Sequence, residues 1–401
     1  MTGALDGYRI IDITSILLGP YGTQLLGDAG ADVIKVEAPP KGDSTRYLGQ
    51  AHSPGMGGPF LNMNRNKRSI ALDLKQDSAR EALVKLIETA DVLVHNMRPQ
   101  AMDRLGFSYD AVRAIKPDII YCGCYGFSQQ GRYKDKPAYD DLIQACSGLA
   151  GLFEAVEGEP KFAPTVMVDK LTGLMMSQAV TTALLHRERT GMGQFVEVPM
   201  FETMVSFLMV EHIYEHGFEP PLGPLGYKRL TTPLRRPHRT RDGYMAVLPY
   251  SDKQWREFFR IADRPELADD PRFTDHTTRN EHVHEIYGLL AEAIAEKTTE
   301  QWLALCEAAQ IPAMPVLSLD QVFADPHLDD VGMFEQHDHP TEGRVVLTKP
   351  PVGYSESPGA IRRQAPRLGQ HGAEVLAELG YDKAAIKAMR NSGALAGEGR
   401  N

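Results

Sequence analysis

The fold is decided by Ser69-Ile-Ala-Leu-Asp-Leu74, a helical segment over residues 77–89 and Ala90-Asp-Val-Leu-Val-His95. The first and last runs are short and apolar, as buried strands are. Between them, apolar residues such as Ala82 and Leu86 recur with helical spacing. Two strands joined by a helical crossover predict a parallel βαβ unit.

The same alternation extends on both sides of this unit. The sequence predicts further strands and helices over 8–13, 21–27, 31–37, around Met102, 111–115, 118–123 and 195–199. Strands separated by helical crossovers are typical of an α/β protein. We therefore expect a mostly parallel sheet with helices on both faces.

Composition excludes several classes of protein. The chain has 401 residues and a net charge of −10, so it lacks the basic excess of a nucleic-acid binder. No apolar run approaches the ~20 residues of a membrane span, and the first residues do not resemble a signal peptide. The four cysteines are read as mostly buried, reduced thiols in a cytoplasmic protein: Cys122, Cys124, Cys146 and Cys306.

Common cofactor and nucleophile motifs are missing. The turn over residues 14–22 lacks Gly-x-Gly-x-x-Gly, and Pro20 and Tyr21 would crowd a pyrophosphate. His212 and His216 have i, i+4 spacing but not the His-Glu-x-x-His order, and no third ligand is apparent, so we expect no metal. A Gly-x-Ser-x-Gly nucleophile does not occur.

Basic residues lie beside the predicted strands. Residues 65–68 precede one strand, Asn96 and Arg98 follow another directly, and Arg104 comes one helical turn later. Ligands of an open parallel sheet sit beyond the carboxyl ends of its strands, and Arg binds phosphate through its planar fork. Asn96, Arg98 and Arg104 are therefore predicted to meet an anionic ligand, with a solvated, salt-bridged surface as the alternative.

Two acidic stretches could carry chemistry. Asp169 follows the apolar run 166–168 and precedes a helical segment over 171–185, which predicts a helix N-cap whose charge the helix N-terminus keeps ionised. About thirty residues earlier, Tyr139 stands beside Asp140 and Asp141, where either chemistry or another N-cap by one of the two acids fits the pattern.

Several short words along the chain match a known family. They are Leu5-Asp-Gly-Tyr-Arg-Ile-Ile-Asp12, Gly27-Asp-Ala-Gly-Ala-Asp-Val-Ile-Lys-Val-Glu37, Gly42-Asp43, Asn66-Lys-Arg-Ser-Ile-Ala-Leu-Asp-Leu74, Asp91-Val-Leu-Val-His-Asn96, Arg104-Leu-Gly-Phe107 and Gly191-Met-Gly-Gln194. In this order and spacing the chain resembles the class III coenzyme A transferases. That family includes formyl-CoA transferase, carnitine CoA transferase and the 2-methylacyl-CoA racemases.

The resemblance implies a mechanism. Asp169 matches the catalytic Asp, which attacks an acyl-CoA, forms a mixed anhydride and then an aspartyl-CoA thioester, and passes CoA to an acceptor carboxylate. CoA and acyl-CoA are then substrates, and no cofactor is bound covalently. The resemblance also places ten residues around CoA: Leu17, Leu18, Leu72, Lys75, Asn96, Met97, Arg98, Arg104, Tyr139 and Asp140.

Three departures from the family pattern limit what is carried over. Ala38 stands where several members have a nucleotide-binding Arg, so either Arg46 or Lys41 replaces that Arg or the contact is absent. Residues 222–241 contain no run of glycines, which argues against formyl and oxalate substrates. Tyr139 replaces the His of the racemases, and a Tyr of pKa ~10 is a poor base at neutral pH, which favours a transferase.

The expected architecture follows from both lines of reasoning. We expect a large Rossmann-like CoA-binding α/β domain over 1–215 and 328–401, with linkers and a small α+β domain over 216–327. The resemblance implies an interlocked homodimer. Its substrates would be an acyl-CoA and a small carboxylic acid, with no nucleic acid or membrane as partner.

Two rival functions and one substrate question stay open. The chain could be an acyl-CoA racemase or isomerase, or a CoA-binding protein without catalysis. The Arg-rich segment 229–241 could attract a second carboxylate, so succinate is a plausible donor acid, or its cations could simply be solvated. The cations and the histidine concerned are Arg235, Arg236, His238 and Arg239.

Overall fold

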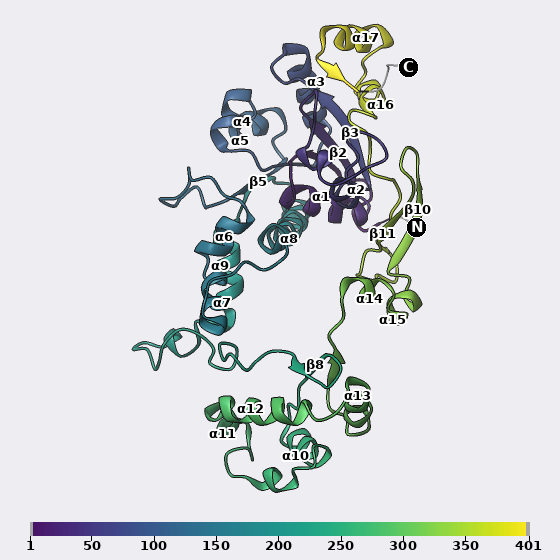
Figure 1. The fold of residues 1–401 in the computed structure, drawn as a ribbon. Helices are drawn as coiled ribbons and strands as arrows, with labels where there is room; N and C mark the ends of the chain where they lie inside the picture. The colour runs from purple at the N-terminus through teal and green to yellow at the C-terminus, as the bar shows by residue number, and fades with distance from the viewer. Residues whose placement is uncertain (1–2, 398–401) are drawn as a thin grey trace. The chain divides into compact units, whose positions relative to one another are not determined.

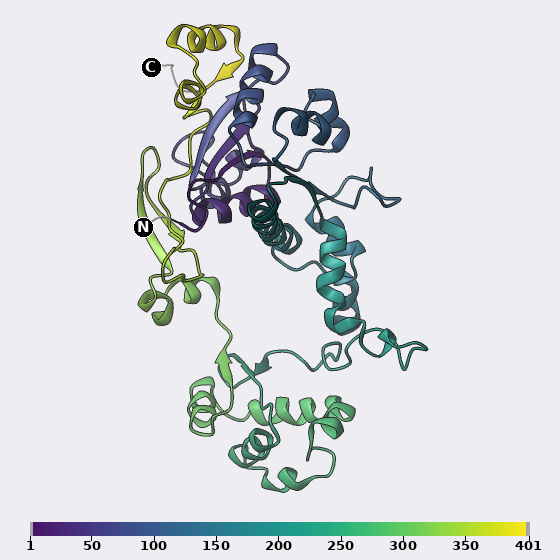
Figure 2. The ribbon, with the colours of Figure 1, turned by 180° about the vertical axis from the view of Figure 1, so that it is seen from behind.

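The computed structural model describes residues 3–397, which form two compact units (Figures 1 and 2). Unit 1 comprises Met1–Ser147, Ala163–Ser206 and His327–Asn401. Unit 2 comprises Gly148–Phe162 and Phe207–Pro326. Within residues 3–397, no helix has the length and apolar character needed to cross a membrane.

Unit 1 is built on a seven-stranded sheet in the order β12-β3-β2-β1-β4-β5-β6. All strands from β1 to β6 pair in parallel, and only β12 is antiparallel. This confirms the predicted mostly parallel sheet. The strands are β1 (Arg9–Ile13), β2 (Asp32–Glu37), β3 (Lys67–Leu72), β4 (Val92–His95), β5 (Ile120–Tyr125), β6 (Gln194–Pro199) and β12 (Leu395–Ala396).

The strand order positions a ligand site. Chain order runs outward in one direction from β1 to β2 and β3, and in the other from β4 to β5 and β6. The connections that leave the carboxyl ends of β1 and β4 therefore go to opposite sides. In open α/β sheets, ligands bind in the crevice at such a reversal.

Helices cover both faces of this sheet (Figures 1 and 2). One face buries every second strand residue, such as Ile11, Ile34 and Leu93, together with apolar side chains of α3, α5, α16 and α17. On the other face α1 packs against α8, and α8 reaches β5 and β6. The helices of unit 1 are α1 (Leu18–Asp28), α2 (Gly58–Met63), α3 (Asp77–Glu88), α4 (Pro99–Leu105), α5 (Tyr109–Ile115), α6 (Asp140–Cys146), α8 (Met167–Thr190), α16 (Gly372–Glu378) and α17 (Lys383–Ser392).

The basic residues over 65–68 form ion pairs within the protein, as the salt-bridged alternative to an anion site predicted. The Lys67 ammonium lies 3.0 Å from Asp12, and the guanidinium groups of Arg65 and Arg68 lie 2.7 and 2.6 Å from Asp28 and Asp32. These acids lie far from their partners in the sequence, so charge spacing alone could not reveal the pairs. The remaining elements of unit 1 are the 3₁₀ turn η1 (Ser44–Tyr47) and the antiparallel hairpin β10 (Phe334–His339) and β11 (Gly343–Thr348).

Unit 2 packs helices against a small antiparallel sheet. Its core holds four large aromatic side chains, Trp255, Phe258, Phe259 and Trp302, of which Phe258 and Trp302 stack at 5.8 Å between ring centroids. Its strands are β7 (His238–Arg239), β8 (Tyr244–Val247) and β9 (Ala313–Pro315). Its helices are α7 (Leu149–Glu157), α10 (Asp252–Ile261), α11 (His276–Glu281), α12 (Val283–Ile294), α13 (Thr299–Ala308) and α14 (Leu319–Phe323), with 3₁₀ turns η2 (Tyr214–Gly217) and η3 (Pro265–Asp269).

Two helices cross the boundary between the units in sequence. Helix α9 (Met200–His212) begins in unit 1 and ends in unit 2, and α15 (Pro326–Asp330) starts where the chain returns to unit 1.

Candidate active site

A cleft of about 650 Å³ lies in unit 1, beyond the carboxyl ends of β1, β4 and β5. Its walls come from residues 15–18 after β1, residues 96–101 after β4 and residues 124–126 at the end of β5. Asp169 and Met200, at the starts of α8 and α9, also line it, as do Arg104, Gln129 and residues 134–139. The volume is within the range of roughly 300–1,000 Å³ that small-molecule sites occupy.

The turn after β1 has a strained backbone that the sequence did not reveal. Ile16 lines the cleft with φ of 73°, which is a rare conformation for a β-branched residue. Its N–H donates to the Asp43 carboxylate at 3.2 Å. The buried Lys35 ammonium lies 3.0 Å from the same carboxylate. The buried ion pair of Lys35 and Asp43 therefore helps to hold Ile16 in this conformation.

Asn96 joins the two loops that form the cleft. Its carboxamide oxygen accepts from the Ser15 N–H at 3.0 Å, and its amide nitrogen donates to the Ser15 carbonyl at 2.8 Å. One amide proton is left for a ligand. Asn96, which was predicted to contact an anion, therefore mainly links the loops that follow β1 and β4.

Four exposed cations line the cleft: Arg98, Arg104, Lys134 and Lys136. Among the described residues, no carboxylate lies within ion-pair distance of any of them. Pro99 at the first position of α4 and Gly106 at its end, with φ of 82°, fix the short helix that carries Arg104. The cleft therefore offers positive charge that is not already neutralised by the protein.

Asp169 is the third residue of α8 and not its N-cap, which corrects the sequence prediction. The N-cap is Val166, whose side chain cannot accept a hydrogen bond. The Asp169 N–H donates instead to the Asp140 carboxylate at 2.9 Å, so a residue of α6 satisfies the helix start. The helix begins at Met167, three residues earlier than it would if Asp169 were its N-cap.

Two glycines hold this part of α8 against α1. A Cβ on Gly22 would lie 2.7 Å from the Gly173 carbonyl oxygen, and a Cβ on Gly173 would lie 2.7 Å from the Leu18 carbonyl oxygen. Only glycine at both positions permits this approach. It places the first turn of α8, and Asp169 with it, beside the loop that follows β1.

The Asp169 carboxyl is held toward its neutral form. Burial first, and then the negative charges of Asp140 and Asp141, raise its pKa from 3.8 to about 7. Within residues 3–397 no side chain donates a hydrogen bond to this carboxylate, and no cation pairs with it. This differs from the expectation that the helix N-terminus keeps Asp169 ionised, because burial and two neighbouring acids favour the neutral form.

Gln144 supports this arrangement, and sequence reasoning missed it. Its amide nitrogen donates to the Asp140 carboxylate at 2.5 Å, and its carbonyl oxygen accepts from the Ala163 N–H at 2.9 Å. Gln144 and Asp140 are both buried. The four-residue spacing on a helix was the only available signal, and it is common enough to carry no information by itself.

The cleft brings together most, but not all, of the residues proposed from the sequence. Asp140 lies just behind its surface and touches Asp169. Leu72 is buried in the core and pairs with Leu395 of β12, whereas Lys75 is an exposed residue after β3. The predicted residues that line the cleft are Leu17, Leu18, Asn96, Met97, Arg98, Arg104, Tyr139 and Asp169.

Arg46 and Lys41, the two possible replacements for the Arg that is absent at position 38, differ in burial. Arg46 is buried, with two nitrogens on the Glu37 carboxylate at 2.6 and 2.8 Å and a third contact to the Pro366 carbonyl. It is therefore committed to the core and is not a free nucleotide ligand. Lys41 is exposed.

Other candidate chemistry is not assembled in this cleft. None of the residues that line it is a histidine, and Tyr139, which stands where the racemases have His, is 62% exposed. In the described part of the chain, no group of three or more His, Cys, Asp or Glu side chains is arranged to hold a metal ion. The cations of the segment 229–241 belong to unit 2.

The sequence is similar to a family of known enzymes. The sequence model of CoA-transferase family III matches residues 5–372. The succinyl-CoA:glutarate CoA-transferase of Mus musculus is 34% identical, over 98% of this chain and 90% of its own length. The succinyl-CoA:mesaconate CoA-transferase of Haloarcula hispanica is 32% identical, over 94% of this chain and 97% of its own length.

A solved structure has the same fold. The crystal structure of Rv3272 from M. tuberculosis superimposes with a TM-score of 0.81 and 29% identity. The superposition covers 93% of this chain and 99% of that one.

Proposed function

The chain belongs to CoA-transferase family III, and from this premise we propose that it transfers CoA from an acyl-CoA donor to a carboxylic acid, with Asp169 as the group that carries the CoA. One observation carries the proposal. A carboxylate without any counter-charge lies in a cleft whose other polar groups include four unpaired cations. The carboxylate can react with an acyl-CoA, and the four cations can hold a ligand with several phosphates.

The proposed reaction has four balanced steps. The Asp169 carboxylate attacks the thioester carbonyl, the C–S bond breaks, and CoA leaves as a thiolate from a mixed anhydride. The thiolate attacks the Asp169 carbonyl carbon and releases the donor acid, which leaves an aspartyl-CoA thioester. The acceptor carboxylate then displaces the thiolate to form a second mixed anhydride. The thiolate attacks its acyl carbon, which yields the new acyl-CoA and restores Asp169.

The surroundings of Asp169 favour the acylated intermediates. An anhydride or thioester on Asp169 carries no charge, so its formation removes the repulsion with Asp140 and Asp141 that raises the pKa of the free acid. The raised pKa also makes the ionised carboxylate a stronger nucleophile. With a pKa of about 7, roughly half of the Asp169 side chains are ionised near pH 7. The site thus destabilises the charged starting state relative to the covalent intermediates.

The cleft cations are assigned to CoA. Arg98 and Arg104 are exposed and unpaired, and guanidinium groups bind phosphate through two parallel hydrogen bonds. Leu17, Leu18 and Met97 would line the path of the pantetheine chain. Tyr139 would lie near the thioester.

The donor and acceptor are proposed to be small dicarboxylic acids. The two similar enzymes described above use succinyl-CoA with glutarate or with mesaconate. All of these acids carry two carboxylates. Succinyl-CoA is therefore the first donor to test.

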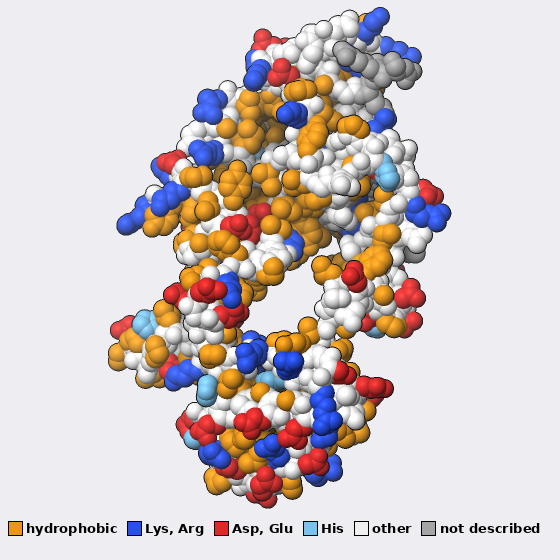
Figure 3. Space-filling view, in the orientation of Figure 1, with side chains coloured by type: hydrophobic (Ala, Val, Ile, Leu, Met, Phe, Trp, Pro, Cys, Tyr) orange, Lys and Arg blue, Asp and Glu red, His pale blue; other side chains and the backbone are white. Residues whose placement is uncertain are grey.

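A homodimer is proposed from the exposed surface of α8. Leu174, Met175 and Leu185 are 48%, 43% and 51% exposed, and Figure 3 shows apolar side chains over the region that α8 occupies in Figure 1. Such a surface is typical of an interface. The family resemblance suggests that the two chains interlock. Light scattering should give twice the 44.4 kDa chain mass, and a stable monomer would contradict this.

The function is tested with a panel of acyl-CoA donors and free acids, with mass spectrometry of the CoA esters that form. The wild-type chain should exchange CoA between at least one pair of acids, and Asp169→Asn should lower the rate by about 10³-fold or more, because the nucleophile is lost. Asp110→Asn, which changes an exposed acid of α5, is the matched control. Unchanged transfer in Asp169→Asn would refute the assignment.

A further inference from the structure

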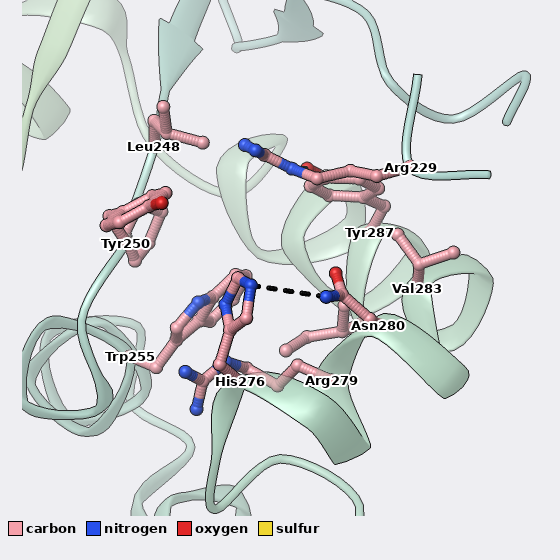
Figure 4. A pocket seen from close by; sticks show the side chains of 11 residues that line it. Arg229, Leu248, Tyr250, Trp255, His276, Arg279, Asn280, Val283 and Tyr287 are labelled. Atoms are coloured by element: carbon pink, nitrogen blue, oxygen red, sulfur yellow. Dashed lines mark hydrogen bonds between the residues drawn. The ribbon is translucent and has the colours of Figure 1, made fainter. Parts of the chain in front are cut away.

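A second cavity lies entirely within unit 2 and shares no lining residue with the cleft that holds Asp169 (Figure 4). It is formed by the segment before β7, the loop after β8 and helices α10, α11 and α12. Tyr250, Trp255 and Tyr287 supply aromatic walls. Figure 4 shows the Arg229 side chain reaching over the cavity, with His276 and Asn280 below it.

Arg229 is the uncompensated charge of this cavity. Its Nε donates to the Tyr287 hydroxyl at 3.2 Å, and its guanidinium lies 6.0 Å from the centroid of the Tyr250 ring. No acidic residue lines the cavity, and among residues 3–397 no carboxylate pairs with Arg229. Aromatic rings and hydroxyls do not neutralise a cation, so the half-buried guanidinium has charge to offer an anion.

Arg279, the other arginine that lines the cavity, is neutralised by the protein itself. Arg279 is buried, donates to the Phe273 carbonyl at 2.9 Å and forms an ion pair with Asp252. Asp252 neutralises the charge of Arg279, and Figure 4 shows the Arg279 guanidinium turned away from Arg229. Only Arg229 therefore remains available to a ligand.

The size of the cavity narrows the class of ligand. Its volume of about 30 Å³ is room for two or three water-sized atoms, at roughly 10–15 Å³ for each. It is much smaller than the ~150 Å³ cavity that accommodates benzene. An aromatic ring is thus too large, whereas the carbon and two oxygens of a carboxylate fit.

The remaining polar groups suit a small acid that enters from solvent. Two further polar groups line the cavity, the Asn280 amide nitrogen and the His276 Nε2, which lie 3.2 Å apart. His276 and Tyr250 are exposed at its edge, so the rest of a ligand could extend outward. A single guanidinium matches the planar, singly charged carboxylate better than a phosphate, which needs more room and more charge.

We propose that this cavity is a binding site for small aliphatic carboxylates, whose carboxylate group pairs with the free edge of the Arg229 guanidinium while the aliphatic part lies toward Tyr250 and solvent. The proposal depends on unit 2 alone. It therefore stands or falls separately from CoA transfer at Asp169.

Tryptophan fluorescence gives a local readout, because the chain has two tryptophans, Trp255 and Trp302, and both belong to unit 2. Glutarate added to the full-length protein without CoA should change the fluorescence saturably, since Trp255 lines the cavity. Calorimetry on the same samples should give the same dissociation constant. Asp169→Asn should bind glutarate as the wild type does, even though it lacks transferase activity.

Variants of Arg229 decide the question. Arg229→Met should weaken glutarate binding by about tenfold or more, as expected for loss of hydrogen bonds to a charged group. Arg229→Lys should weaken it less, because the charge remains but the fork is lost. Arg256→Met, which removes an exposed arginine of α10 outside the cavity, should leave binding unchanged.

Three results would overturn the proposal. One is unchanged glutarate binding in both Arg229 variants while their circular dichroism is native. A second is the absence of any saturable fluorescence change or heat in the wild type. The third is displacement of glutarate by phosphate or chloride as strongly as by butyrate, which would show a general anion site. If Arg229→Met fails to fold, Arg229→Lys and the competition of butyrate, phosphate and chloride with glutarate still test the proposal.

Discussion

Asp12 and Asp169 are two buried carboxylates of the same unit with opposite environments. Burial would raise the pKa of Asp12, but the charges of Lys67 and Lys35 and hydrogen bonds from Thr14 and Thr23 outweigh it and hold that pKa well below its usual range. The Lys67 ammonium lies 3.0 Å away.

Asp169 has none of these partners. Its backbone N–H is satisfied by another acid, Asp140, and its own carboxylate faces the cleft without a donor. Burial and two acids raise its pKa to about 7. The difference shows that partners, and not burial alone, separate a structural carboxylate from a reactive one.

The largest effect is expected where a paired charge is broken. Asp12→Asn leaves the ammonium groups of Lys67 and Lys35 buried without that anion, which should lower the free energy of unfolding by about 3–5 kcal/mol. Urea unfolding followed by circular dichroism measures it. Asp6→Asn, at an exposed site, should change stability by less than about 0.5 kcal/mol. A small effect at Asp12 would erase the contrast between the two carboxylates.

Asp169→Asn should do the opposite and stabilise the chain at high pH. The folded state holds a proton on Asp169 more tightly than the unfolded state does, so ionisation lowers stability as pH rises from 3.8 to about 7. Asn removes that cost, which is on the order of 2–4 kcal/mol above pH 7. The gain should vanish near pH 4. Melting temperatures across this range measure it, and an equal gain at both ends would contradict the assigned pKa.

Arg98 and Arg104 of the cleft lack an ion-pair partner, as Asp169 does, so they test whether unpaired positive charges also serve the reaction. Arg98→Gln and Arg104→Gln should each raise KM for acyl-CoA by about tenfold, with little change in kcat, because each removes a contact to phosphate made throughout the reaction. The effect should shrink as salt is added. Arg113→Gln, an exposed arginine of α5, is the control. An unchanged KM in both cleft variants would argue that these cations are merely solvated.

The smallest effect tests the cause of the raised pKa. Asp140→Asn keeps an oxygen for the Asp169 N–H but removes a negative charge, so the pKa of Asp169 should fall. The acidic limb of kcat/KM against pH should move to lower pH by about one unit. Asp141→Asn should move it less, because Asp141 contributes less to the shift. An unmoved limb in Asp140→Asn would assign the shift to burial alone.

The sequence predicted the central sheet because the strands are short apolar runs separated by helical spacing. It also predicted that the loop with Asn96 and Arg98 follows a strand at its carboxyl end, where the cleft lies. Both inferences use order along the chain, and the parallel topology converts that order into proximity.

What the sequence could not reveal depends on contacts between distant residues. Lys67 and Asp12 are 55 positions apart, and Asp169 and Asp140 are 29 apart. Neither pairing leaves a local pattern. The ion pair of Lys67 was therefore not predicted, and Asp169 was expected to cap its own helix and to stay ionised.

The central claim is that Asp169 carries CoA as a thioester during turnover. The most direct measurement is mass spectrometry of the peptide that contains Asp169, after incubation with succinyl-CoA and trapping with hydroxylamine or borohydride. The account predicts a hydroxamate, or the reduced side chain, at Asp169 in the wild type, only when acyl-CoA is present, and none in Asp169→Asn. Continued CoA transfer with Asp169 unmodified, or with the label on another residue, would contradict it.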